Sequence, residues 1–440
     1  MNQACLFSSI TVVSTNGPES CTILPDAWVT VRDGLIQYVG RSESDARRSL
    51  AGQTHETYAG AGKILLPTLA NTHGHLAMTL LRNQADDRNL QDWLFNVIFP
   101  RETRLSQDIV RTGTRLGIAE MIRSGTGAAA DMYYYNEAVA EAALTAGFRL
   151  NFCCDTKAAG PDNQSHVVPE ILRQDLARYH RHPSGLLRVS LLVHSVYLYE
   201  AAIYPELAAA ALAMACPVQV HVSETKREVE ECLQKYGCRP PRQLEKFGFF
   251  QTPTIAAHCV FLNDEDRAIL ARHQVLAAHN PSSNLKLGSG LADLPAMLKA
   301  GMAVGLGTDG AASNNNLDLY REMRLASFLA KGTSGDAAAM PATTVLDMAT
   351  RQGMAGLGFA GSGRIESGCA ADLQIVDTAR PAMTPLGNPV SALVYSADSG
   401  CVESLMVAGR WLMRKRELLT LDEEKVIWEA EKAANYLNGV

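Results

Sequence analysis

The 440-residue sequence lacks an excess of charge of either sign. Lys and Arg total 40 and Asp and Glu total 46, which gives a formal net charge of −6 at pH 7. A balance of this kind offers no electrostatic footprint for nucleic acid or for an acidic membrane surface. The composition therefore argues against both partners and favours a small molecule.

Long apolar runs and dense cysteine patterns are missing as well. No apolar run approaches membrane-spanning length, and the amino terminus, Met1-Asn2-Gln3-Ala4-Cys5-Leu6, has neither the basic start nor the apolar core of a secretion signal. The ten cysteines include no Cys-x-x-Cys pair, so we expect most of them to be reduced and buried. These absences predict a cytoplasmic protein.

Short apolar runs separated by helix-like segments recur from about residue 64 onward, and many of them end in a polar or ionisable residue. This alternation predicts an α/β fold with a parallel sheet, and eight repeats predict a closed (β/α)8 TIM barrel with its chemistry at the carboxyl ends of the strands. A different strand order stays open at the second and third runs. The predicted strands are 64–71, 127–132, 149–155, 188–194, 217–223, 254–258, 275–280 and 303–309.

The two ends of the chain differ from this pattern, because they are rich in short strands and turns. Pairing of the two ends would build one small β-sandwich, with the barrel as a continuous insertion and a helix over 421–436. The expected strands are 9–13, 28–32, 35–39, 373–376, 390–394 and 402–407. The predicted domains are 1–63 and 363–440 for the β-sandwich and terminal helix, and 64–362 for the barrel.

His73 and His75 leave the end of the first predicted barrel strand together. Side chains two residues apart on a strand point to the same face, so both rings can reach one metal ion. Taken alone, this pair also fits two surface histidines in a loop. His221 and Asp309 end the fifth and eighth predicted strands, and four potential ligands at strand ends predict a metal site that keeps an open position for water. We expect one divalent ion, with zinc first and iron(II) or manganese(II) as alternatives.

Two further polar residues fall beside this predicted site. Glu224 lies three residues after His221, so we predict that it shuttles the proton of the attacking water, although an acid that complements a helix dipole would also suit this position. His258 ends the sixth strand and would hydrogen-bond the attacking hydroxide, unless its role is structural. Asp309 can also accept a proton while it binds the metal.

Several segments also carry a family resemblance across essentially the whole chain. They are 71–78, Ala85-Asp86-Asp87, Trp93-Leu94, Pro100-Arg101-Glu102, His221-Val222-Ser223-Glu224-Thr225, Ala257-His258-Cys259-Val260, 279–290 and 307–315. These segments are similar to the amidohydrolase superfamily, in particular to its 5-methylthioadenosine/S-adenosylhomocysteine deaminases. The resemblance implies the metal ligands and the roles of Glu224 and His258 given above. It also implies that Glu102 contacts ribose hydroxyls, that His194 contacts a purine ring nitrogen, and that Trp93 lies against the substrate.

The activity implied by the resemblance is hydrolytic deamination of an adenine nucleoside to the inosine analogue and ammonia. The expected substrates are 5-methylthioadenosine, S-adenosylhomocysteine, 5-deoxyadenosine and adenosine. The fourth strand offers no lysine that would bridge two metal ions, which favours a single ion. Departures from the family pattern at Asn83-Gln84, at Phe99 and over 153–162, where an arginine is missing, leave the ribose substituent open.

Two alternatives to this activity remain. The first is the same centre acting as an aminohydrolase or chlorohydrolase on an s-triazine, guanine or a pterin, because the run Asp92-Trp93-Leu94-Phe95-Asn96-Val97 is also similar to triazine hydrolases. The second is an inactive barrel that serves as a scaffold, which would be expected to lack a ligand or the shuttle. The superfamily also suggests a homodimer or a larger homo-oligomer.

Overall fold

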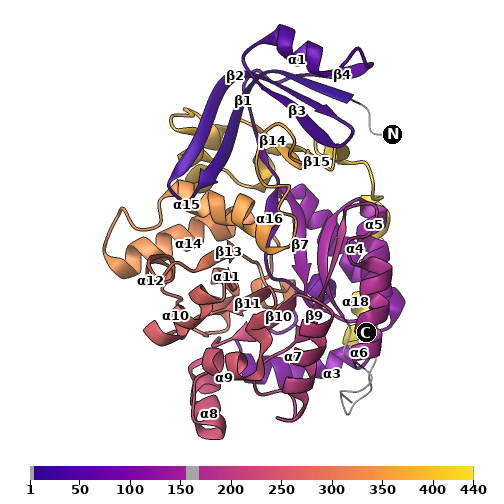
Figure 1. The fold of residues 1–440 in the computed structure, drawn as a ribbon. Helices are drawn as coiled ribbons and strands as arrows, with labels where there is room; N and C mark the ends of the chain where they lie inside the picture. Colours follow the sequence, from indigo (N-terminus) through magenta and orange to yellow (C-terminus); the bar gives the residue numbers. More distant parts are fainter. Residues whose placement is uncertain (1–3, 155–167, 440) are drawn as a thin grey trace.

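The computed structural model describes residues 4–154 and 168–439. In Figure 1, a sheet built from both ends of the chain lies above a barrel that holds the middle of the chain. The end of the predicted third strand at Asp155, and residues 155–162 of the segment that lacks an arginine, lie outside the described residues. No described helix is long and apolar enough to cross a membrane.

Eight parallel strands form the barrel in the order in which they occur along the chain. They are β6 (Leu69–Asn71), β7 (Thr126–Asp131), β8 (Arg149–Cys154), β9 (Leu187–Val193), β10 (Val218–Val222), β11 (Thr254–His258), β12 (Leu276–His279) and β13 (Ala303–Leu306). The backbone N–H of Thr72 donates a hydrogen bond to the carbonyl of Leu306 at 2.8 Å, which links the first strand to the eighth. The predicted barrel and its strand order are confirmed.

The barrel strands are buried on both faces, as expected for a parallel sheet that helices cover from outside. Small and branched residues fill the interior, and Met354, Leu357 and Phe359 pack beneath Ala128 and Ala278 in one apolar cluster. This packing fills the interior away from the carboxyl ends of the strands. The covering helices are α4 (Gln107–Arg123), α5 (Asn136–Ala146), α6 (Val168–Tyr179), α7 (Ile203–Ala213), α8 (Lys226–Tyr236), α9 (Pro240–Phe247), α10 (Asp264–Arg272), α12 (Leu294–Lys299) and α14 (Leu319–Ser334).

The predicted strand over 64–71 is in fact two strands that belong to different sheets. β5 (Lys63–Pro67) pairs with β1 (Ala4–Gly17) and β14 (Leu373–Asp377), whereas β6 pairs with β7 in the barrel. Pro67 has no N–H to continue the ladder, and Thr68 donates its N–H to Asp372 instead. The apolar run is continuous in sequence, but the chain exchanges its partners at this point.

The sheet at the chain ends contains nine strands from both termini. In addition to β1, β5 and β14 it contains β2 (Ser20–Arg32), β3 (Leu35–Gly40), β4 (His55–Ala59), β15 (Val402–Val407), β16 (Arg410–Arg414) and β17 (Glu417–Leu418). Phe7 and Val29 from the amino-terminal part pack in one buried cluster with Leu373 and Met406 from the carboxyl-terminal part. This shared core holds the two ends of the chain together.

One expected strand of this sheet, over 390–394, is wrong. The segment is helical, with α17 (Pro389–Ser391) followed by a π-helical turn, η7 (Ala392–Ser396). Asn388 accepts the N–H groups of Val390 and Ser391, and Pro389 occupies the first helical position. Both features start a helix and override the strand preference of the valines.

The terminal helix predicted over 421–436 is confirmed as α18 (Glu423–Asn438). Its first turn is capped by Asp422, which accepts the N–H of Lys425 at 3.0 Å. The helix runs beside α4, with which it makes its most extensive contacts (Figure 1). The carboxyl terminus therefore returns to the barrel instead of ending in the sheet.

Candidate active site

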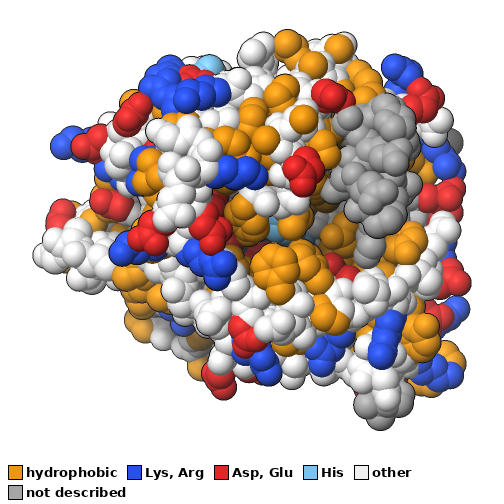
Figure 2. All heavy atoms as spheres, turned by 90° about the horizontal axis from the view of Figure 1, so that it is seen from below, with side chains coloured by type: hydrophobic (Ala, Val, Ile, Leu, Met, Phe, Trp, Pro, Cys, Tyr) orange, Lys and Arg blue, Asp and Glu red, His pale blue; other side chains and the backbone are white. Residues whose placement is uncertain are grey.

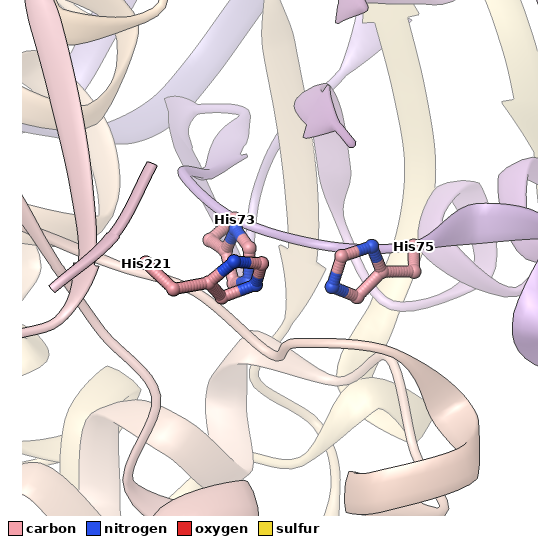
Figure 3. Close-up of side chains that lie close together, drawn as sticks. All are labelled: His73, His75 and His221. Carbon is pink, nitrogen blue, oxygen red and sulfur yellow. The ribbon is translucent and has the colours of Figure 1, made fainter. Parts of the chain in front are cut away.

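Three histidine rings meet at the carboxyl ends of the barrel strands (Figure 3). His73 and His75 follow β6 and His221 lies in β10, and the ring of His73 is 4.9 Å from each of the other two, measured between ring centroids. One nitrogen from each ring lies within 4.8 Å of the others, a spacing that suits a shared metal ion. His73 is completely buried, yet neither of its ring nitrogens has a hydrogen-bond partner among the described residues.

The other two histidines are held by backbone carbonyls. Nδ1 of His75 lies 2.6 Å from the carbonyl of Met132, and Nδ1 of His221 lies 2.7 Å from the carbonyl of His194. A carbonyl only accepts, so each Nδ1 carries the hydrogen and each Nε2 keeps its lone pair. Histidines that bind metals are oriented in this way.

Asp309 adds a carboxylate to the three rings. Its Oδ1 lies 3.4 Å from Nε2 of His73 and 3.3 Å from Nε2 of His75. Its Oδ2 accepts hydrogen bonds from the hydroxyls of Ser283 at 2.6 Å and Ser313 at 2.8 Å. The two serines thus occupy one carboxylate oxygen and leave the other directed at the histidines.

The electrostatics of this cluster favour a cation. Burial lowers the pKa of His73 to about 4, so the ring is neutral near pH 7. Burial acts to raise the pKa of Asp309, but the neighbouring His73 and His75 rings outweigh this effect and hold the pKa well below its usual range. The neutral His73 ring and the ionised, buried Asp309 carboxylate belong to a donor set that fits a divalent metal ion.

Glu224 and His258 lie beside this cluster, as the sequence predicts. Glu224 is buried just after β10, and its Oε1 accepts a hydrogen bond from the Ser289 hydroxyl at 3.1 Å. Its Oε2 lies 3.7 Å from Nε2 of His258, whose Nδ1 pairs with the Asn284 amide oxygen at 2.8 Å. Burial raises the pKa of Glu224, which increases the affinity of this carboxylate for a proton.

The cluster lies at the floor of a cavity of about 340 Å³. Figure 2 looks into the barrel end from below and shows histidine side chains inside a hollow that is framed mainly by hydrophobic side chains. Of the predicted site residues, all except His73 line this cavity. His73 is buried beside His75 and His221.

The three predicted substrate contacts enter the cavity from different elements. Trp93 ends α2 (Leu90–Trp93), Glu102 ends α3 (Phe99–Glu102), and His194 follows β9. Burial lowers the pKa of His194 to about 3, so this ring is neutral. Glu102 is only 4% exposed, and burial together with the Glu102 carboxylate raises the pKa of the neighbouring Tyr133. The walls of the cavity therefore offer a ligand the carboxyl group of Glu102 and the neutral imidazole of His194.

His279 occupies a different place from the other histidines. It ends β12 but lines a separate, small cavity with Leu294 and Ala330, and its ring nitrogens have no hydrogen-bond partner within the described part of the chain. The main cavity does not include it.

Sequence reasoning missed the residues that orient the site. Ser283 and Ser313 hold Asp309, Asn284 holds His258, and Ser289 holds Glu224. Three of these four residues lie between β12 and β13. Their hydroxyl and amide side chains follow the end of a barrel strand, and this position could have indicated that they lie near the site.

Comparisons with known proteins agree with this arrangement. A model of the amidohydrolase family matches residues 64–412. The 5-methylthioadenosine/S-adenosylhomocysteine deaminase of Dictyoglomus thermophilum is 45% identical over 379 residues, which cover 85% of this chain and 88% of that relative. The 5′-deoxyadenosine deaminase of Methanothermobacter thermautotrophicus is 40% identical over 410 residues, which cover 93% of this chain and 96% of that relative.

Solved structures place the fold in the same family. The crystal structure of an adenosine deaminase from Xanthomonas campestris with bound zinc superposes with a TM-score of 0.90 at 31% identity, and the match covers 99% of both chains. The family match, the relatives and this structure extend over most of the chain, including both the barrel and its histidine cluster. The chain therefore belongs to the amidohydrolase family of metal-dependent hydrolases.

Proposed function

We propose that the protein is a metal-dependent deaminase that hydrolyses the exocyclic amine of an adenine nucleoside, giving the inosine analogue and ammonia. The observation that carries this proposal is the buried Glu224 carboxylate beside the histidine and aspartate cluster, on the floor of a cavity whose walls hold Glu102 and His194. The names of the two relatives, both adenine-nucleoside deaminases, support the substrate class.

His73, His75, His221 and Asp309 would hold one divalent ion. Zinc is our first choice, because the similar adenosine deaminase structure contains zinc, while iron(II) and manganese(II) accept the same ligands. When bound, such an ion supplies a Lewis acid and lowers the pKa of a coordinated water to about 7.

The protein side chains move the protons of the reaction. Glu224 takes a proton from the attacking water and delivers it to the ring nitrogen next to the amine-bearing carbon. The water oxygen bonds to this carbon, and the second proton of the water then passes to the amine as the carbon–nitrogen bond breaks. Ammonia leaves, and the ring carbon keeps the oxygen as a carbonyl. The raised pKa of Glu224 suits a group that must both accept and return a proton. His258 faces Glu224 through Nε2 and holds the attacking water between them.

The walls of the cavity position the nucleoside. The neutral His194 ring hydrogen-bonds a purine nitrogen, and the Glu102 carboxylate accepts hydrogen bonds from ribose hydroxyls. Trp93 and Phe99 provide apolar surface around them. The substituent on the ribose is methylthio, homocysteinyl, hydrogen or hydroxyl. We also propose that the protein is cytoplasmic, as its sequence predicts, and that it forms a homo-oligomer, as the family resemblance suggests.

Ammonia release tests the proposed function. Metal-analysed protein is given 5-methylthioadenosine, S-adenosylhomocysteine, 5-deoxyadenosine, adenosine, guanine and an s-triazine, and the ultraviolet change of the base is followed in parallel. We expect rapid turnover of one or more adenine nucleosides. Turnover of guanine or the triazine alone would keep the hydrolytic centre and reject the substrate class, and a metal-loaded protein without any activity would reject the proposal.

A further inference from the structure

We propose that Glu228 positions the proton shuttle Glu224 by holding the two backbone N–H groups that lead into it. This inference rests on the proposed function, in which Glu224 carries the proton. Glu228 touches neither the metal-binding cluster nor the main cavity, so its effect on the reaction would pass entirely through Glu224.

The shuttle lies on a sharp turn that needs support. β10 ends at Val222, and Ser223 then adopts a φ of +50°, in the left-handed region that non-glycine residues seldom occupy. Such a conformation is strained and persists only where its surroundings enforce it. The direction of the Glu224 side chain follows from this turn, because Glu224 is the next residue.

The Glu228 carboxylate enforces the turn with both of its oxygens. Oε1 accepts the N–H of Ser223 at 2.9 Å, and Oε2 accepts the N–H of Glu224 at 2.8 Å. Two bonds from one planar group fix both the position and the orientation of the peptide between Ser223 and Glu224. Within the described part of the chain, the only hydrogen-bond partner of the Glu224 carboxylate is the Ser289 hydroxyl, and His258 lies 3.7 Å away.

The position of Glu228 in its helix shows that these contacts are not an ordinary cap. Thr225 caps α8, and its hydroxyl accepts the N–H of Glu228 at 3.1 Å, which makes Glu228 the third helical residue. In a capping box the third residue returns a hydrogen bond to the N–H of the capping residue. The Glu228 carboxylate also lies near the N–H of Thr225, as in a capping box, but its two short hydrogen bonds go to Ser223 and Glu224, in the turn that carries the shuttle.

Burying the Glu228 carboxylate is unfavourable unless hydrogen bonds compensate for the loss of water. Glu228 is 3% exposed, and no Lys or Arg forms an ion pair with it among the residues that the structure describes. Burial acts to raise its pKa, whereas the backbone N–H groups of Ser223, Glu224 and Thr225 favour the ionised carboxylate and oppose this rise. The Thr225 hydroxyl already caps the helix, and the hydrogen bonds of Glu228 to Ser223 and Glu224 hold the turn that precedes it.

Glu228→Gln tests the proposal, because glutamine keeps the size of the side chain but presents an N–H₂ group to one of the two N–H donors. We expect kcat to fall about 10- to 100-fold, as for an approximately 1 Å displacement of a catalytic group, with KM and metal content unchanged. The solvent deuterium isotope effect on kcat should rise, since proton transfer becomes slower. Glu228→Asp, which keeps both oxygens on a shorter side chain, should show a smaller loss and replaces the glutamine variant if that variant does not fold.

Two control variants separate positioning from stability. Thr225→Ala removes the cap of the same helix and should lower the melting temperature while kcat stays unchanged. Glu231→Gln removes an exposed carboxylate of α8 and should change neither. An unaltered kcat and isotope effect in Glu228→Gln, or a loss in Thr225→Ala that matches it, would overturn the inference. An inactive wild-type protein would instead overturn the proposed function.

Discussion

The hydrolytic centre and the substrate wall of the same cavity are built in different ways. The centre takes its side chains from or just beyond barrel strand ends, and each of His75, His221 and Asp309 has a buried partner that fixes its orientation. The wall that carries Trp93 and Glu102 comes from three short pieces, α2, the π-helical turn η2 (Leu94–Ile98) and α3, which lie between β6 and α4. In the proposed function, the barrel thus supplies the reacting groups, while a separate segment contacts the substrate.

The segment that carries the wall also reaches the outer surface of the molecule, unlike the centre. Phe95 of η2 is 48% exposed, whereas His73 is completely buried. The loop before α2 is held by a hydrogen bond in which Nζ of Lys286 donates to Oδ1 of Asp86 at 2.5 Å. Substitutions in this wall should therefore alter substrate preference without removing hydrolysis, and substitutions in the centre should remove hydrolysis for every substrate.

The largest effect is expected from His73→Asn, which removes a ring with two unpartnered buried nitrogens from the centre. Metal content and turnover should both fall to background, because the proposed site loses one of its four protein ligands. Metal analysis and ammonia release measure the outcome. His55→Asn in β4 of the chain-end sheet is the matched control and should retain both. Normal turnover in His73→Asn would show that the cluster is not the centre.

Glu224→Gln should separate proton transfer from metal binding. Glutamine keeps the hydrogen bond with Ser289 but cannot take a proton, so kcat should fall about 100- to 10,000-fold while the metal content stays that of the wild type. Steady-state kinetics of a metal-analysed sample measure both quantities. Glu231→Gln on the surface of α8 controls for the loss of one carboxylate. A variant with near-normal kcat would remove Glu224 from the mechanism.

Glu102→Gln tests the proposed contact between the wall of the cavity and the ribose of the substrate. Loss of a charge-assisted hydrogen bond to ribose should cost about 1.5–3 kcal/mol, or about 10- to 150-fold in kcat/KM for a nucleoside. Adenine without ribose should be turned over with unchanged, low efficiency. The ratio of the two kcat/KM values is the measurement, and an equal loss for nucleoside and free base would place Glu102 in the centre instead.

The smallest expected effect is a shift of the acid limb of the pH profile. Burial raises the pKa of Glu224, and the shuttle must be ionised to accept a proton, so kcat/KM should decline as pH falls through this raised pKa. The limb should therefore lie above the pKa of about 4.3 of a free glutamate. His194, with a pKa of about 3, stays neutral over this range. Metal content at each pH is the control, and a flat profile down to pH 4 with metal retained would contradict the raised pKa.

The barrel was largely predictable from sequence, because its strands are continuous apolar runs that end in polar residues. Residues 64–71 were assigned to one strand because hydrophobicity does not reveal which sheet a residue pairs with, and only Pro67 marked the change. The segment 390–394 was assigned to a strand because its valines outweighed the helix start at Asn388 and Pro389. The domain boundaries at 63 and 362 stay predictions.

The residues of the proposed metal site were predictable for a geometric reason. Parallel strands bring their carboxyl ends to one edge of the barrel, so polar residues at these ends must meet. The supporting residues were not, because Ser283 lies 26 residues from Asp309 in sequence and Ser289 lies 65 residues from Glu224. Such pairs depend on the exact course of loops, which a sequence pattern does not specify.

Product analysis in ¹⁸O-labelled water tests the central claim most directly. Metal-loaded protein is incubated with 5-methylthioadenosine, and the product is examined by mass spectrometry. The account predicts an inosine analogue that keeps its ribose, has lost the exocyclic amine as ammonia and carries one ¹⁸O atom on the ring carbon. Free adenine, an unlabelled product or unchanged substrate under these conditions would contradict it.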